Sequence, residues 1–153
     1  MTTNRSLQFC LALGRATAAL TRRFDGKLGM WHGISLNDLA ILIELRDAPE
    51  GRLRRVDLAE RLGVTASGVT RALIPLEKIG LVTRKPDASD ARVSYASLTA
   101  AGRRLTDDYV ASAEMISEDL VAVDDDAAAD CIAVFDRLSG REPDRSTARR
   151  AAR

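Results

Sequence analysis

The sequence has 153 residues, of which 46% are hydrophobic and 29% charged, with a net charge of +1, as expected for one soluble domain with a buried core. No apolar run approaches the roughly 20 residues of a membrane span, and the N-terminus lacks a signal-peptide pattern, so we expect a cytoplasmic protein without a membrane partner. Two cysteines far apart in the sequence, Cys10 and Cys131, favour a reducing compartment over a disulfide framework.

A long helix is predicted over about residues 6–30. Its apolar stripe is wider than packing within one domain requires. Gly29 and Gly33 are predicted to break this helix. A second helix is expected to begin after Ser35, because Ser35 and Asp38 resemble a capping box.

The centre of the chain has the pattern of a helix-turn-helix motif. Val56, Ala59 and Leu62 recur at helical spacing and predict the buried face of one short helix. Gly63 is expected to end that helix, because glycine adopts a left-handed backbone without steric cost. Thr65 is predicted to cap the next helix through its hydroxyl. The buried face of this next helix is predicted to consist of Val69, Leu73 and Leu76.

Two strands are predicted after these helices, over residues 81–84 and 92–98, joined by a polar turn over 85–91. A helix-turn-helix motif followed by such a β-ribbon is a winged helix. Further helices are predicted near 100–122, capped by Thr99, and near 125–139. Residues 141–153 have no apolar periodicity and predict a disordered basic tail.

The central segment closely resembles the MarR family of bacterial transcriptional regulators. The most specific part is the pattern Asp87-x-x-Asp90-x-Arg92 followed by Leu98-Thr99-x-x-Gly102. The resemblance implies a mainly α fold with a small β-wing, in which a winged helix-turn-helix is flanked by N- and C-terminal dimerisation helices. It also implies a homodimer on a pseudo-palindromic operator in double-stranded DNA. Many members release DNA when a small anionic aromatic ligand or an oxidant arrives.

This family layout predicts a single MarR-like domain over residues 1–140. The DNA-binding lobe would span about 35–99, and the dimerisation helices about 6–30 and 100–139. The apolar stripes of the terminal helices favour packing against a symmetry mate, with a monomeric six-helix bundle as the alternative.

Charge is distributed unevenly along the chain. Residues 52–104 contain eleven Lys or Arg and five acids, whereas residues 105–140 contain one Arg and ten acids. A basic module beside an acidic one suits a nucleic-acid binder that presents only one face to phosphate. Two differently solvated surfaces are the alternative interpretation.

The exposed start of the second helix of the motif is predicted to face DNA bases. Arg71 is the candidate for a bidentate contact to guanine, with a phosphate contact as the alternative. Arg92 resembles the family's minor-groove arginine, held in position by Asp90. Arg84 is expected either to contact phosphate or to pair with Asp87 or Asp90. The predicted DNA contacts are Arg54, Arg55, Thr65, Ala66, Ser67, Thr70, Arg71, Arg84, Lys85, Asp90 and Arg92.

An effector site is predicted near the junction of the first two helices, because the resemblance implies a cleft between the dimer helices and the DNA-binding lobe. Its candidate residues are Arg15, Phe24, Trp31 and His32, which could bind an aromatic acid. A structural role is the alternative for His32. One histidine and two distant cysteines offer no metal-ligand spacing, so neither a metal nor another cofactor is expected.

Cys10 defines an alternative sensor. The run Cys10-Leu11-Ala12-Leu13 resembles the Cys-x-Ala-Leu of the OhrR branch, which senses organic peroxides through a thiol held by tyrosine hydroxyls. No tyrosine precedes Tyr95 here, and Phe24 occupies one place where that branch would have one, so the small-molecule effector is preferred.

Two other function classes fit the sequence less well. A winged-helix protein–protein interaction module would not need Arg92 or the basic segment. The sequence shows no nucleophile–base pair or metal constellation, so we do not expect an enzyme.

Overall fold

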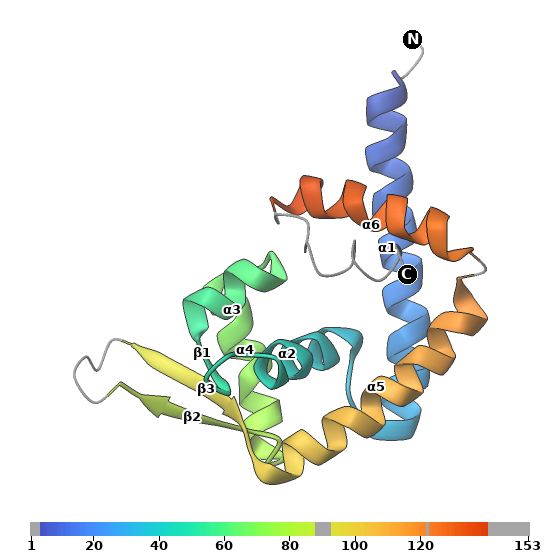
Figure 1. Cartoon of the computed structure of the whole chain (residues 1–153). Coiled ribbons are helices and arrows are strands. Elements are labelled where there is room, and N and C mark those ends of the chain that lie inside the picture. The colour runs from blue at the N-terminus through green and yellow to red at the C-terminus, as the bar shows by residue number, and fades with distance from the viewer. Residues whose placement is uncertain (1–3, 88–92, 122, 141–153) are drawn as a thin grey trace. The chain divides into compact units, whose positions relative to one another are not determined.

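The computed structural model describes residues 4–87, 93–121 and 123–140 (Figure 1). The chain divides into two compact units, Met1–Leu120 and Val121–Arg153. The single domain expected over residues 1–140 spans both units and remains a prediction. Asp90, Arg92 and the predicted tail lie outside the described residues.

The first unit contains helices, a helix-turn-helix and a small sheet. In chain order its elements are α1 (Arg5–His32), α2 (Leu36–Arg46), β1 (Arg52–Arg54), α3 (Arg55–Leu62), α4 (Ala66–Lys78), β2 (Val82–Pro86), β3 (Ser94–Leu98) and α5 (Ala100–Leu120). The second unit contains α6 (Asp125–Ser139). No helix among the described residues is long and apolar enough to cross a membrane.

The first helix is longer than predicted. α1 continues through Gly29 and ends only at Gly33, which has a φ of 69° and whose N–H donates to the Gly29 carbonyl. The break expected at Gly29 is therefore wrong: a glycine inside a helix costs about 1 kcal/mol but does not by itself end it. The capping box of α2 is confirmed, because Ser35 Oγ accepts from the Asp38 N–H at 3.1 Å and Asp38 Oδ2 accepts from the Ser35 N–H at 2.9 Å.

The turn and the second helix of the motif match the prediction. Gly63 has a φ of 65°, and Thr65 Oγ1 accepts from the Gly68 N–H at 3.1 Å, which caps α4. The buried face of α4 consists, as predicted, of Val69, Leu73 and Leu76. α4 is therefore anchored to the core along one side, and its opposite side is available for recognition.

The buried face predicted for α3 is partly wrong. Val56 is 52% exposed, whereas Leu58 is fully buried and Ala59 is 6% exposed. α3 has only eight residues, so the phase of its apolar face is poorly determined by periodicity alone. Leu58 packs in the hydrophobic core, and Val56 lies outside it.

The sheet has three antiparallel strands in the order β1-β3-β2. β2 and β3 form the predicted ribbon, with β2 extending to Pro86. β1 was not predicted. Arg54, expected at the start of the third helix, lies in β1 opposite Tyr95 and directly precedes α3.

The start of α5 is fixed to the DNA-binding lobe. Thr99 caps α5, as predicted, by accepting from the Gly102 N–H at 2.9 Å, while its own N–H donates to the Leu81 carbonyl at 3.0 Å. Gly102 lies so close to Leu81 that an added Cβ would stand 2.8 Å from its carbonyl carbon. This contact gives a physical reason for threonine and glycine at these two positions.

In the second unit, α6 has the predicted bounds. Asp124 caps it by accepting from the Ala127 N–H at 2.9 Å, and Gly140 ends it with a φ of 73°. α6 has no buried residue, and its large apolar side chains Ile132, Phe135 and Leu138 are exposed.

Candidate nucleic-acid interface

The outward face of α4 carries polar and basic side chains. Ser67 and Arg71 are exposed and lie one helical turn apart, on the side opposite the buried face. The hydroxyls of Thr65 and Ser67 are 3.1 Å apart at the start of the helix. This exposed first half of α4 can present Arg71 to a groove of DNA while its other side remains packed.

Thr70 connects α4 to α3. Arg55 Nη1 donates to Thr70 Oγ1 at 3.2 Å, and Thr70 Oγ1 in turn donates to the Ala66 carbonyl at 2.9 Å. The Thr70 hydroxyl proton is therefore already used, and this side chain positions the exposed guanidinium of Arg55.

Arg54 forms an ion pair at the start of α3. Its Nε and Nη2 donate to the two carboxylate oxygens of Asp57 at 2.8 and 3.0 Å. The hydrogen bond to Asp57 raises the pKa of Arg54. Exposed ion pairs contribute little stability, and a DNA phosphate could replace Asp57 at small cost.

Arg84 has a partner that the sequence interpretation did not consider. Its Nε donates to Glu77 Oε2 at 2.8 Å, and its Nη2 contacts the same oxygen. These hydrogen bonds hold the pKa of the Glu77 carboxyl below its usual range. The half-buried pair joins β2 to the end of α4, while the adjacent Lys85 is exposed.

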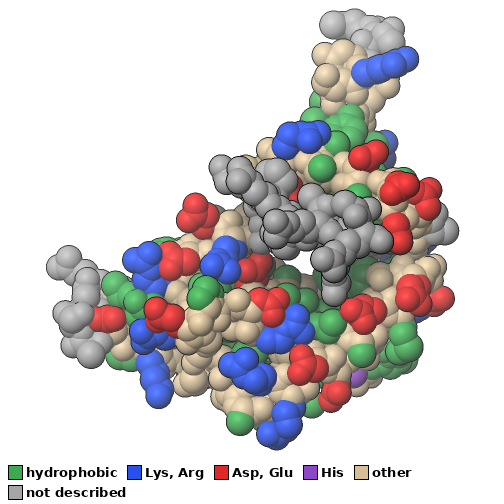
Figure 2. All heavy atoms as spheres, viewed as in Figure 1, with side chains coloured by type: hydrophobic (Ala, Val, Ile, Leu, Met, Phe, Trp, Pro, Cys, Tyr) green, Lys and Arg blue, Asp and Glu red, His purple; other side chains and the backbone are tan. Residues whose placement is uncertain are grey.

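Sequence reasoning also missed an aromatic contact on the sheet. The Arg52 guanidinium lies 4.6 Å from the centre of the Tyr95 ring. Figure 2 shows Lys and Arg side chains at this end of the lobe, interspersed with Asp and Glu. This contact was missed because β1 was not predicted. Arg52 and Tyr95 are 43 positions apart in the sequence, and only the pairing of β1 with β3 brings them together.

The four predicted effector residues do not come together within the chain. α1 is continuous, so Arg15 and Trp31 are separated by about 24 Å along its axis. Phe24, Trp31 and His32 occupy its last turns. Trp31 is 49% exposed, and Phe24 packs against the core.

His32 attaches the end of α1 to α5. Its Nε2 forms a 2.8 Å hydrogen bond with Ser112 Oγ, and its ring centre lies 4.6 Å from that of Tyr109. Burial raises the pKa of the Tyr109 hydroxyl. These contacts fit the structural alternative for His32.

Cys10 is exposed near the start of α1. Tyr109 lies beside His32, about 33 Å from Cys10 along the helix axis. Tyr95 lies in β3 under Arg52. Neither of the chain's two tyrosines is therefore placed to hold the Cys10 thiolate within one subunit.

An exposed helix on a helix-turn-helix, a basic lobe and an antiparallel ribbon define a winged helix DNA-binding protein. The sequence profile of the MarR family matches residues 34–94. No curated protein matches the chain.

Solved structures extend this similarity over almost the whole chain. The transcriptional regulator BldR from Sulfolobus solfataricus is 25% identical, with a TM-score of 0.78 over 93% of this chain and 100% of that chain. Sco3205, a MarR family regulator from Streptomyces coelicolor solved in complex with DNA, is 24% identical, with a TM-score of 0.74 over 94% and 92%. BpsR from Bordetella bronchiseptica, whose DNA binding is regulated by 6-hydroxynicotinic acid, is 21% identical, with a TM-score of 0.75 over 86% and 98%. Residues 34–94 thus match the MarR family, and the chain shares its fold with solved transcriptional regulators, among them a MarR family member bound to DNA.

Proposed function

We propose that this chain is a repressor that binds a pseudo-palindromic operator as a homodimer and leaves it when a small aromatic or anionic ligand binds. The observation that carries the proposal is the exposed Ser67–Arg71 face at the capped start of α4. A helix presented in this way fits the major groove, where Arg71 can make two hydrogen bonds to guanine. In this arrangement Arg55 and Lys85 would contact DNA phosphates.

The evidence for a homodimer is exposed apolar surface on α1. Leu7, Phe9 and Leu11 of α1 are 51%, 44% and 51% exposed, and this part of α1 extends beyond α2 and α5 (Figure 1). A second copy could bury these side chains twice through one two-fold axis. The same axis would place two copies of α4 on one face of DNA, about one helical turn apart.

The proposed effector response depends on the connection between α1, α5 and the lobe. His32 contacts α5 through Ser112, Phe24 and Trp31 lie in the same last turns of α1, and α5 is fixed to the lobe through Thr99 and Gly102. A ligand that preferred one packing of α1 on α5 would change the spacing of the two recognition helices. The change in the free energy of DNA binding would be limited by the difference in the ligand's binding free energy between the two packings. Such couplings are typically about 1–3 kcal/mol. The aromatic acid that regulates BpsR supports this chemical class.

The proposal is tested by selecting genomic DNA fragments with the purified protein and footprinting those that are enriched. We expect a symmetric footprint with two half-sites about 10 bp apart, and an affinity that falls steeply with salt. The Arg71→Ala variant is the control, because Arg71 is exposed and its loss should weaken the enrichment and relax one operator position without unfolding α4. A single isolated half-site, or affinity independent of salt, contradicts the proposal.

A further inference from the structure

The sheet has one face that packs on the core and one that carries cations. Burial alternates along the strands: Leu53 and Ala96 are buried, whereas Arg52 and Arg54 are exposed and Tyr95 is half-buried. Because successive side chains of a strand point to opposite faces, the two arginines and the tyrosine share the outer face.

The outer face surrounds one aromatic ring with positive charge. The cross-strand partners of Tyr95 are Arg54 in β1 and Lys85 in β2, and directly opposite residues share a face. The Arg52 guanidinium lies 4.6 Å from the ring centre. We call Arg52, Arg54, Lys85 and Tyr95 the sheet patch.

Carboxylates only partly neutralise the sheet patch. Arg52 Nη2 pairs with Glu50 at 3.1 Å, and Arg54 Nε pairs with Asp57 at 2.8 Å, which leaves three cations against two acids. The Arg52, Glu50 and Arg54 side chains are 52%, 72% and 49% exposed, so both pairs are solvent-screened and readily exchanged for another anion.

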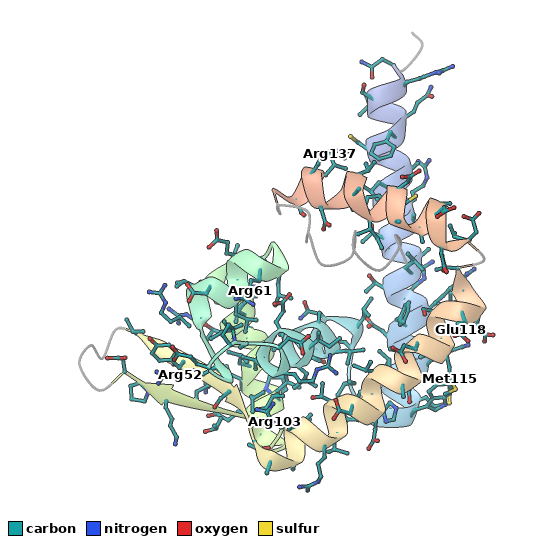
Figure 3. All side chains as sticks on the ribbon, in the orientation of Figure 1. Arg52, Arg61, Arg103, Met115, Glu118 and Arg137 are labelled. Atoms are coloured by element: carbon teal, nitrogen blue, oxygen red, sulfur yellow. The ribbon has the colours of Figure 1, made fainter. Side chains whose placement is uncertain are left out.

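A further cation borders the patch from α5. Arg103 Nη2 lies 3.6 Å from the position that a Cβ on Gly51 would occupy, next to Arg52 in the chain (Figure 3).

The position of the sheet patch relates it to the recognition surface. Arg54 directly precedes Arg55, which contacts Thr70 on α4. Lys85 lies in β2, just before the turn that joins the two strands of the ribbon. The patch thus extends from the helix-turn-helix to the end of the ribbon nearest its turn. Its complement is a regularly spaced polyanion.

We propose that the sheet patch binds the phosphate backbone of duplex DNA outside the half-site that α4 reads. The inference rests on the proposed operator binding and adds Arg52 and Tyr95 to the interface. Arg52 contacts a phosphate, and Tyr95 holds the guanidinium over its ring so that fewer rotamers are lost on binding. Phosphate contacts of this kind set the register of a protein on DNA and carry no base specificity.

The test compares two duplexes that contain the same operator. The short duplex ends at the outer base pair of each half-site, and the long one continues for about 10 bp on both sides. For the wild-type dimer we expect tighter binding and a steeper salt dependence on the long duplex. Each phosphate contact adds about 0.9 to the slope of log affinity against log salt, or about 3.5-fold in affinity between roughly 50 and 200 mM salt.

A variant in the sheet patch and a variant beside it should act in opposite directions. Arg52→Gln should lower the slope on the long duplex by about 0.9 per subunit and leave the short duplex unchanged. Glu50→Gln releases Arg52 and removes a negative charge, so it should tighten binding to the long duplex alone. This gain cannot result from misfolding. Lys78→Gln, the same charge change in the last turn of α4, is the matched control and should affect neither duplex.

The outcomes separate this inference from the proposed function. Wild-type protein that selects the operator but binds both duplexes equally overturns the sheet patch and leaves the proposed function standing. Equal losses on both duplexes in Arg52→Gln also overturn it. A wild-type protein without any operator preference refutes the proposed function, and the inference with it.

Discussion

The contact between Gly102 and Leu81 makes a quantitative prediction about how α5 is held on the DNA-binding lobe. In Gly102→Ala the new Cβ would stand 2.8 Å from the Leu81 carbonyl carbon, so the backbone must move. Overpacking of this kind costs about 1–3 kcal/mol. Lengthening the 3.0 Å hydrogen bond from Thr99 to Leu81 costs about 1 kcal/mol more, which the better helix propensity of alanine roughly offsets.

We therefore expect Gly102→Ala to lower the free energy of unfolding by about 1–3 kcal/mol. For a chain of this size, a loss of about 2 kcal/mol corresponds to a fall in Tm of roughly 4–8 °C. Urea denaturation at one fixed protein concentration measures the loss, because the stability of a dimer depends on concentration.

Gly26→Ala is the matched control for this measurement. Gly26 is exposed inside α1, and an added Cβ would meet nothing within 4 Å, so the substitution should be neutral or stabilising by up to about 1 kcal/mol. If Gly102→Ala were as stable as Gly26→Ala, the close contact between α5 and the lobe would be refuted.

Three further predictions concern recognition, sensing and pH. Arg71→Ala should weaken operator binding by about 1–3 kcal/mol and relax one operator position in a binding-site selection; equal losses on all sequences would reduce Arg71 to a phosphate contact. DNA release by an aromatic acid such as salicylate should survive Cys10→Ser and weaken in Trp31→Ala in a mobility-shift titration; release by organic peroxide that disappears in Cys10→Ser would instead identify the thiol as the sensor. Arg84 lowers the pKa of Glu77, so this pair stabilises the fold above the ordinary carboxyl pKa of 4.5 and the stabilisation is lost as pH falls below it. The stability difference between the wild type and Glu77→Gln should accordingly shrink from about pH 7 to about pH 3, and a constant difference would exclude this linkage.

The features that could be predicted from sequence are those determined by nearby residues. The caps at Ser35, Thr65 and Thr99 involve partners three positions away, and the left-handed turn at Gly63 depends on one residue. α4 was placed correctly because three apolar residues over two turns fix the phase of its buried face.

The features that were missed depend on distant partners. β1 has three residues and exists because Arg52 pairs with Ser97, which no local pattern indicates. The partner of Arg84 is Glu77 because β2 folds back along the end of α4. The stacking of Arg52 on Tyr95 likewise requires the sheet register, so the outer face of the sheet could be recognised only in the folded chain.

The central claim is sequence-specific DNA binding, and competition at about 150 mM salt tests it most directly. Labelled operator from the genomic selection is bound to the wild-type protein and displaced with unlabelled operator or with a scrambled duplex of equal length. We predict that the scrambled duplex competes at least about 1,000-fold less well, as specific DNA-binding proteins typically show. Equal competition by the two duplexes would mean that the chain binds DNA by charge alone and would contradict the proposed operator binding.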